Sequence, residues 1–325
     1  MQLSGLAREP AADLALVSVG FEQRSRAVPT HLSAPALGIG MEFGDRHEDA
    51  YEDNRQAVAD RGYEILVPES DPAAIVGEMD SWLERAASRR NLSERQPLRV
   101  TIDISSMTRT RIAAVIEASH TKLGDMPAVI DLLYAPASYR KCELDPPSFI
   151  HANPVTHHFA GWDPDASKEL LACVGLGYEP YAAEGVVEYL TPDESIAIVP
   201  NGRDPHYRAD VLDVNGEVLK KADMKLEYDV EDPYRLMLEL ERLVLAQIET
   251  RRIIFIPLGP KIFAAVCMLV AQRLHPMVSV WRFSAGARGK GQPAEAAGWL
   301  CGIRLTTQPQ DTPAFDAEDT PQGRG

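Results

Sequence analysis

The segment from residue 103 to residue 111 combines one acid, several hydroxyls and two arginines within nine positions. They include Asp103, Ser105, Ser106, Thr108, Arg109 and Arg111. An apolar, β-branched run precedes the segment and the apolar run 112–116 follows it, which predicts a strand-to-helix turn. Such a turn directs backbone N–H groups and hydroxyls toward the carboxyl end of a sheet, and this favours a phosphate or another anion.

Most of these residues also have a purely structural interpretation. Ser105 or Ser106 could be the N-cap of the helix, and Asp103 could brace the loop by accepting backbone hydrogen bonds. The two arginines are harder to explain, since cations in a first helical turn oppose the helix dipole at a cost of about 0.3–1 kcal/mol. Pairing of these arginines with Glu22 is the main competing explanation.

The elements around this segment alternate short apolar runs with longer helical ones. In the first half, strands are expected at 14–19, 36–43, 63–67, 98–102 and 128–134, and helices at 51–61, 73–90 and 112–120. The strands are apolar throughout rather than alternating, which is typical of a mainly parallel sheet covered by helices on both faces.

The second half of the chain repeats this plan. Strands are expected at 170–174, 195–199, 224–228, 252–256 and 278–283, with helices at 233–248 and 262–274. Gly20-Phe21-Glu22 after the first strand also matches Gly177-Tyr178-Glu179. We therefore predict an α/β fold of two tandem Rossmann-like units with mainly parallel sheets, related by a pseudo-two-fold duplication. The expected limits are 1–140 for the first unit, 141–165 for a linker, 166–305 for the second unit and 306–325 for a disordered tail.

Ligands of open α/β sheets bind outside the carboxyl ends of the strands, where the topology changes direction. The loops after the first and fourth strands of each half are therefore the candidate site. The predicted ligand-binding residues are Phe21, Arg24, Ser25, Ser105, Ser106, Thr108, Arg109, Arg111, Gly177, Tyr178, Gly259 and Lys261, and the candidate catalytic residues are Glu22 and Asp103. Arginine suits such a site because its planar fork can grip a phosphate with two hydrogen bonds.

Composition narrows the classes of function. The chain has 325 residues, of which 45% are hydrophobic, and a formal net charge of −15. That charge argues against a broad grip on duplex nucleic acid but allows a local basic pocket for a small anion. We see no signal-peptide pattern and no apolar run as long as a membrane span, and the four cysteines lack zinc-site spacing. We expect a cytoplasmic protein with no metal and no cofactor.

One resemblance to a known family lies in residues 103–109. This run resembles the strand-four motif of CARF domains, Rossmann-like sensors of cyclic oligonucleotides, whose pattern is Asp, any, Thr/Ser, any, Gly, Thr, Lys. Asp103, Ser105, Thr108 and Arg109 fit the pattern, whereas Met107 stands where glycine would let the backbone approach a phosphate.

A tandem duplication resembles SAVED domains, in which two such units are fused in one chain. The second half keeps only Gly259 and Lys261 of the motif. The resemblance implies a cyclic oligonucleotide as ligand and a place in antiviral defence.

Three classes of function remain open. The first is a sensor of a nucleotide second messenger, in which the cations hold phosphates and Phe21 or Tyr178 stacks on a base. Such a sensor would act through a protein partner with effector activity or hydrolyse its own ligand. The second is an enzyme that acts on a nucleotide or sugar phosphate by phosphodiester cleavage or ribosyl transfer, with Glu22 or Asp103 as general acid/base. The third is a scaffold subunit of a protein complex.

Overall fold

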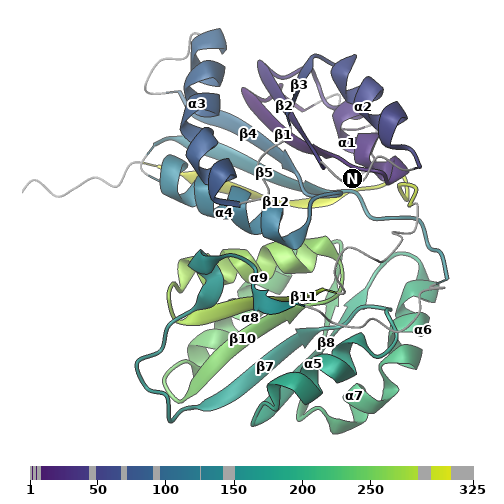
Figure 1. The fold of residues 1–325 in the computed structure, drawn as a ribbon, viewed down its shortest axis with the longest axis vertical. Helices are drawn as coiled ribbons and strands as arrows, with labels where there is room; N and C mark the ends of the chain where they lie inside the picture. The colour runs from purple at the N-terminus through teal and green to yellow at the C-terminus, as the bar shows by residue number, and fades with distance from the viewer. Residues whose placement is uncertain are drawn as a thin grey trace, which may run out of the picture.

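The chain forms two six-stranded sheets that alternate with helices, one sheet in each half of the molecule (Figure 1). The computed structural model describes residues 2, 5, 9–43, 49–66, 72–90, 96–124, 126–141, 151–284 and 294–308, and the structural statements below refer to these residues.

The first sheet has the strand order β12-β5-β4-β1-β2-β3. Its strands are β1 (Leu14–Val19), β2 (Leu37–Glu42), β3 (Tyr63–Leu66), β4 (Leu98–Asp103), β5 (Ala128–Tyr134) and β12 (Cys301–Thr307). The first five strands are mutually parallel, and β12 is antiparallel to β5. The helical elements of this unit are η2 (Gln23–Arg26), α1 (Ala27–His31), α2 (Tyr51–Ala59), α3 (Pro72–Arg90) and α4 (Arg109–Leu123).

The second sheet repeats this arrangement with the order β6-β11-β10-β7-β8-β9. Its strands are β6 (His151–Pro154), β7 (Glu169–Gly175), β8 (Glu194–Asn201), β9 (Met224–Asp229), β10 (Arg251–Pro257) and β11 (Val278–Ser284). Its helical elements are η3 (His157–Ala160), α5 (Ala182–Leu190), α6 (Pro205–Val214), α7 (Gly216–Lys221), α8 (Pro233–Gln247) and α9 (Lys261–Arg273). Strands β7 to β11 correspond one by one to β1 to β5, which confirms two tandem Rossmann-like units.

The antiparallel edge strands lie outside the ranges expected for their units. β6 falls in the segment predicted as a linker, yet it pairs with β11. β12 pairs with β5 of the first sheet, although the sequence placed 301–305 in the second unit and 306–307 in a disordered tail. β6 is only four residues long and most residues of β12 are not buried, so neither pattern reveals which sheet the strand joins. Residues 309–325 of the predicted tail lie outside the described residues.

Helices α4 and α9 pack against each other between the two sheets, so that the units share one hydrophobic core (Figure 1). Every residue of α9 from Ile262 to Ala271 is buried. A helix that is apolar on all sides must be covered on all sides, and α9 is covered by its own unit and by α4. Cys173 and Cys267 are buried free thiols in this core, as predicted. No helix among the described residues is long and apolar enough to cross a membrane.

Gly175 ends β7 beneath α9, and its missing side chain leaves room for the ring of Phe263. We expect Gly175→Ala to destabilise the protein by about 1–3 kcal/mol, because the new Cβ would overlap that ring in a packed core. Gly77→Ala is the matched control, since Gly77 lies on an exposed part of α3 with open space around its Cα. The control should be neutral or stabilising by up to about 1 kcal/mol. Urea unfolding of both variants measures this, and equal effects would contradict the packing role of Gly175.

Candidate functional site at the junction of the two units

The turns that lead into α4 and α9 face each other and are in direct contact. A guanidinium N–H of Arg109 donates to the carbonyls of Leu258 (2.8 Å) and Gly259 (3.0 Å), and Nζ of Lys261 donates to the carbonyl of Ser105 (2.8 Å). Arg109 and Lys261 are the first residues of their helices and occupy equivalent places in the two units. Each unit therefore contributes one cationic side chain that donates hydrogen bonds to the backbone of the other unit.

Glu22, which follows β1, and Arg24, in η2, form a largely buried ion pair beside this contact. Nε of Arg24 lies 2.8 Å from a carboxylate oxygen of Glu22, and Arg24 is only 7% exposed. Burial alone would raise the pKa of Glu22, but the charges of Lys261 and Arg24 outweigh it and hold the pKa below its usual value. The ion pair that the structure gives to Glu22 is therefore with Arg24, and not with Arg109 or Arg111.

Asp103, the last residue of β4, is buried and braces the loop that follows it. Its Oδ1 accepts hydrogen bonds from the backbone N–H (2.9 Å) and the hydroxyl (2.5 Å) of Ser105. Burial raises the pKa of Asp103 to about 6, although Ser105, Lys261 and Arg24 all favour the charged form. Burial likewise lowers the pKa of Lys261 to about 7, against the opposing influence of Glu22.

The hydroxyls of the turn have three different environments. Thr108 is the N-cap of α4, because its Oγ1 accepts from the backbone N–H of Arg111 (3.2 Å). The expectation of a cap at Ser105 or Ser106 is therefore wrong, since the chain makes one further turn before the helix begins. Ser105 Oγ instead bonds Asp103 and accepts from the N–H of Ala135 (2.8 Å). Ser106 Oγ is buried and has no hydrogen-bond partner in the described residues.

Arg111 and Ser25 are engaged in holding the first unit together. The guanidinium of Arg111 donates to the carbonyls of Met41 (3.1 Å) and Glu42 (2.6 Å) at the end of β2 and lies 3.9 Å above the ring of Phe43. Ser25 Oγ donates to the carbonyl of Ser18 (2.6 Å). These contacts explain both residues without a ligand.

The two predicted glycines permit close contact between loops of the second unit. A Cβ on Gly259 would lie 2.5 Å from the carbonyl oxygen of Leu176, and one on Gly177 would lie 2.9 Å from that of Leu258. Only glycine fits such an approach of two backbones.

The two predicted aromatic residues lie in different places. The ring of Tyr178 is 5.6 Å from that of Tyr207, and Phe21 packs on the small core formed by β1, α2 and β3.

Three residues that influence this cluster were not predicted from the sequence. Tyr134, at the end of β5, hydrogen-bonds Arg24, and Glu179 is the acid whose charge most favours the ionised form of Arg109. Tyr207 lies near the start of α6, and its pKa is affected by Tyr134 and Arg24. The prediction considered only loops after the first and fourth strands of each half. The sequence did carry a signal for Tyr134, because this tyrosine is the last residue of the apolar strand expected at 128–134.

The junction cluster is defined here as Glu22, Arg24, Asp103, Ser106, Arg109 and Lys261. It contains three basic side chains and two acids, and the pKa of one of these acids, Asp103, is raised to about 6. Nε of Arg109 and Oγ of Ser106 are buried without hydrogen-bond partners in the described residues. Because buried polar groups are nearly always paired, each of these two atoms is a group that a polar or anionic ligand would satisfy.

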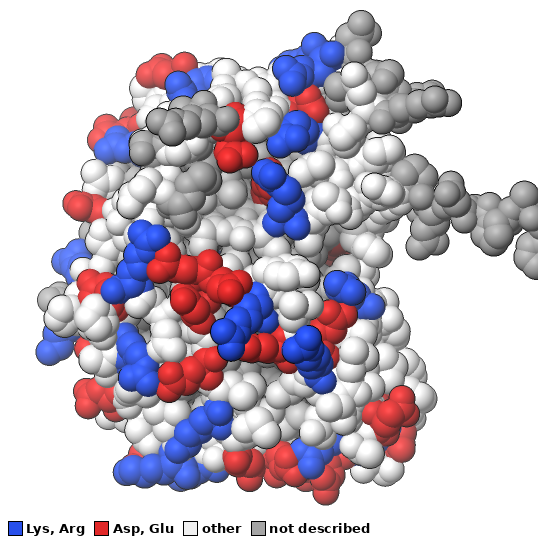
Figure 2. Space-filling model, turned by 180° about the vertical axis from the view of Figure 1, so that it is seen from behind, with Lys and Arg blue, Asp and Glu red and all other residues white. Residues whose placement is uncertain are grey.

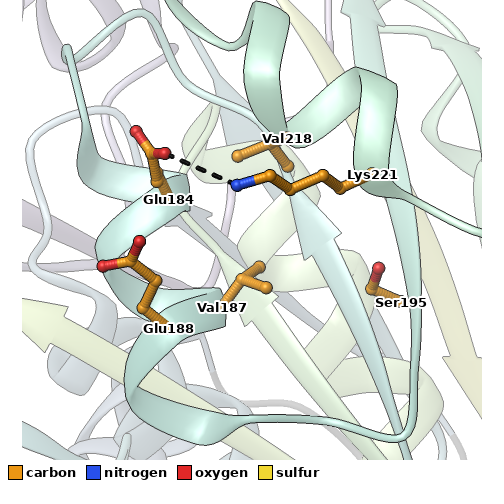
Figure 3. Close-up of a pocket in the computed structure, with 6 residues that line it drawn as sticks. All are labelled: Glu184, Val187, Glu188, Ser195, Val218 and Lys221. Carbon is orange, nitrogen blue, oxygen red and sulfur yellow. Dashed lines mark ion pairs between the residues drawn. The ribbon is translucent and has the colours of Figure 1, made fainter.

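A separate pocket lies in the second unit between α5, α7 and β8 (Figure 3). It is lined by Glu184, Val187, Glu188, Ser195, Val218 and Lys221. Lys221 Nζ lies 4.0 Å from a carboxylate oxygen of Glu184, as the dashed line in Figure 3 marks. None of the predicted site residues lines this pocket. On the face drawn in Figure 2, acidic and basic side chains are interspersed, so this face offers no broad basic field to a nucleic acid.

No protein-family model matches the chain, and no curated protein matches it. Among solved structures, the chain is similar to the complex of leucoanthocyanidin reductase with NADPH from Vitis vinifera, at 9% sequence identity and a TM-score of 0.23. The alignment covers 82% of this chain and 92% of that chain. So low a similarity carries no argument about ligand or reaction. The class of the protein is defined by its own topology, which is that of a tandem Rossmann-like α/β protein.

The raised pKa of Asp103 predicts a dependence of stability on pH. Between about pH 4 and pH 6 the folded protein keeps a proton that the unfolded chain has released, so this group makes stability fall as pH rises. Asp103→Asn keeps an oxygen that can accept the Ser105 hydrogen bonds but cannot titrate. We expect the free energy of unfolding of this variant, minus that of the wild type, to increase from pH 4 to pH 7 in urea titrations.

Asp80→Asn removes an exposed carboxylate from α3 and controls for the loss of one negative charge. If the difference for Asp103→Asn were constant over this pH range, Asp103 would not be a buried acid with a raised pKa.

Proposed function

We propose that this protein binds a nucleotide at the junction of its two Rossmann-like units. The observation that carries the proposal is the junction cluster, in which Arg24 and Arg109 lie near enough to Lys261 for their charges to act on its pKa. Two buried polar atoms of this cluster, Nε of Arg109 and Oγ of Ser106, have no hydrogen-bond partner in the described residues. In Rossmann-like sheets the edge formed by the carboxyl ends of the strands is the usual place for nucleotides.

The phosphate groups of the ligand are assigned to Arg109, Lys261 and Ser106. Arg109 uses one guanidinium nitrogen on the carbonyls of Leu258 and Gly259, while its Nε has no partner in the described residues and can donate to a phosphate oxygen. A bound phosphate would also raise the pKa of Lys261 from about 7, so that the ammonium would be fully charged at neutral pH.

The resemblance of residues 103–109 to CARF domains, together with the tandem duplication, favours a cyclic oligonucleotide as the ligand. On this basis we assign the protein to the sensors of nucleotide second messengers, with a role in antiviral defence. In this proposal the signal passes to a partner protein that carries the effector activity.

Isothermal titration calorimetry with cyclic di-AMP, a cyclic triadenylate, ATP and tripolyphosphate tests this proposal. We expect at least one of these anions to bind, and Arg109→Met and Lys261→Met each to weaken its binding by tenfold or more. The reason is that each variant removes one charge-assisted contact to phosphate.

Arg235→Met is the control, since Arg235 pairs with Glu239 on the exposed surface of α8. It should bind as the wild type does. If none of the anions bound to the folded wild type at high micromolar concentration, the proposal would be wrong and the cluster would serve only to join the units.

A second function, cleavage of the bound nucleotide, is favoured by the two acids of the cluster. The pKa of Glu22 is lowered while that of Asp103 is raised, and a pair of carboxyls with separated pKa values is the usual arrangement for acid/base catalysis. Incubation with the same nucleotides, followed by chromatography, tests for phosphodiester cleavage or ribosyl transfer. Product formation that persists unchanged in Glu22→Gln and Asp103→Asn would remove these residues from the mechanism.

A further inference from the structure

Four aromatic side chains form a continuous group at the junction, here called the aromatic group: Tyr139, Tyr178, His206 and Tyr207. The rings of Tyr139 and His206 are stacked, with centroids 5.2 Å apart and an interplanar angle of 28°. Tyr207 meets Tyr139 edge-on at 5.3 Å and meets Tyr178 at 5.6 Å. The group joins segments of both units, because Tyr139 follows β5 whereas the other three residues follow β7 and β8.

The aromatic group lies at the same edge of the sheets as the junction cluster. All four residues come a few positions after the carboxyl end of a strand. Tyr207 is near enough to Tyr134 and Arg24 for their charges to act on its pKa, which burial raises. Tyr134 in turn hydrogen-bonds Arg24. The aromatic group therefore lies next to the junction cluster.

Hydrogen bonds between the units hold two of the rings in place. The hydroxyl of Tyr139 donates to a carboxylate oxygen of Asp210 (2.9 Å), and that of Tyr207 donates to the carbonyl of Ser138 (3.0 Å). At the outer end of the group, 70% of the His206 side chain is exposed to solvent. A fixed ring system with an open end is a suitable platform for a flat ligand, since little conformational entropy is lost on binding.

From this geometry we infer that the aromatic group binds the base of the ligand, so that the ligand class is a nucleotide and not a sugar phosphate or inorganic phosphate. The inference rests on the proposed function, since it extends the same site. In it, the junction cluster holds phosphate and the aromatic group stacks on the base. Stacking of one base on an aromatic side chain strengthens binding by about 5- to 150-fold.

The experiment compares a nucleotide with a phosphate that has no base. 2-Aminopurine riboside triphosphate serves as the nucleotide, because its fluorescence is quenched when the base stacks, and tripolyphosphate serves as the phosphate. We expect the wild type to quench the fluorescence and to bind the nucleotide at least tenfold more tightly than tripolyphosphate. We expect Tyr139→Leu and His206→Leu to weaken nucleotide binding by fivefold or more, with reduced quenching and an unchanged affinity for tripolyphosphate.

Tyr234→Leu, which changes an exposed tyrosine at the start of α8, is the matched control and should behave as the wild type does. Thermal unfolding checks that each variant is folded, and the His206 variant keeps the test open if Tyr139→Leu is not. Equal affinities for the two probes, with no effect of either substitution, would overturn the inference and leave the phosphate site intact. If the wild type bound neither probe, nor cyclic di-AMP or a cyclic triadenylate, the proposed function would be overturned as well.

Discussion

The contact between α4 and α9 is the interaction on which the rest of the structure depends. These helices bury their apolar faces against each other and against their own sheets, which joins the two units in one core. At their amino-terminal ends, Arg109 and Lys261 each donate to backbone carbonyls of the opposite unit. Cations at these positions oppose the dipoles of their own helices. Backbone carbonyls of the other unit accept hydrogen bonds from both cations, and the charges of Glu22 and Glu179 favour the charged forms of Lys261 and Arg109 respectively.

The duplication is symmetric in topology and asymmetric in chemistry. Each unit has five parallel strands in the same order and one antiparallel edge strand. The first unit supplies Glu22, Arg24, Asp103 and Arg109 to the junction, whereas the second supplies Lys261 and most of the aromatic group. Such a division suits a ligand with a charged end and a flat end. A ligand bound as proposed would lie against both units, so that its binding would alter the contacts that hold them together.

The sequence predicted the class of fold because buried parallel strands and amphipathic helices have clear patterns, and it grouped residues of the two turns that lead into α4 and α9 in one candidate site. It could not predict which unit β12 joins, since an edge strand has no distinctive pattern. Within the turn, residue type alone did not separate roles. Ser105 and Ser106 are neighbours of the same type, yet one braces Asp103 and the other has a buried, unpaired hydroxyl. Such differences depend on contacts between distant segments, such as the bond from Ala135 to Ser105.

We propose that a nucleotide phosphate binds between the two units at Arg109 and Lys261. A crystal structure of the protein soaked with 8-bromo-ATP tests this, because anomalous scattering from bromine locates the base independently of the phosphates. We expect phosphate density within hydrogen-bond distance of Nε of Arg109 and of Nζ of Lys261, with the bromine signal beside Tyr139 and His206. Clear nucleotide density at another part of the surface, with the contacts between Arg109, Lys261 and the opposite carbonyls unchanged, would contradict it.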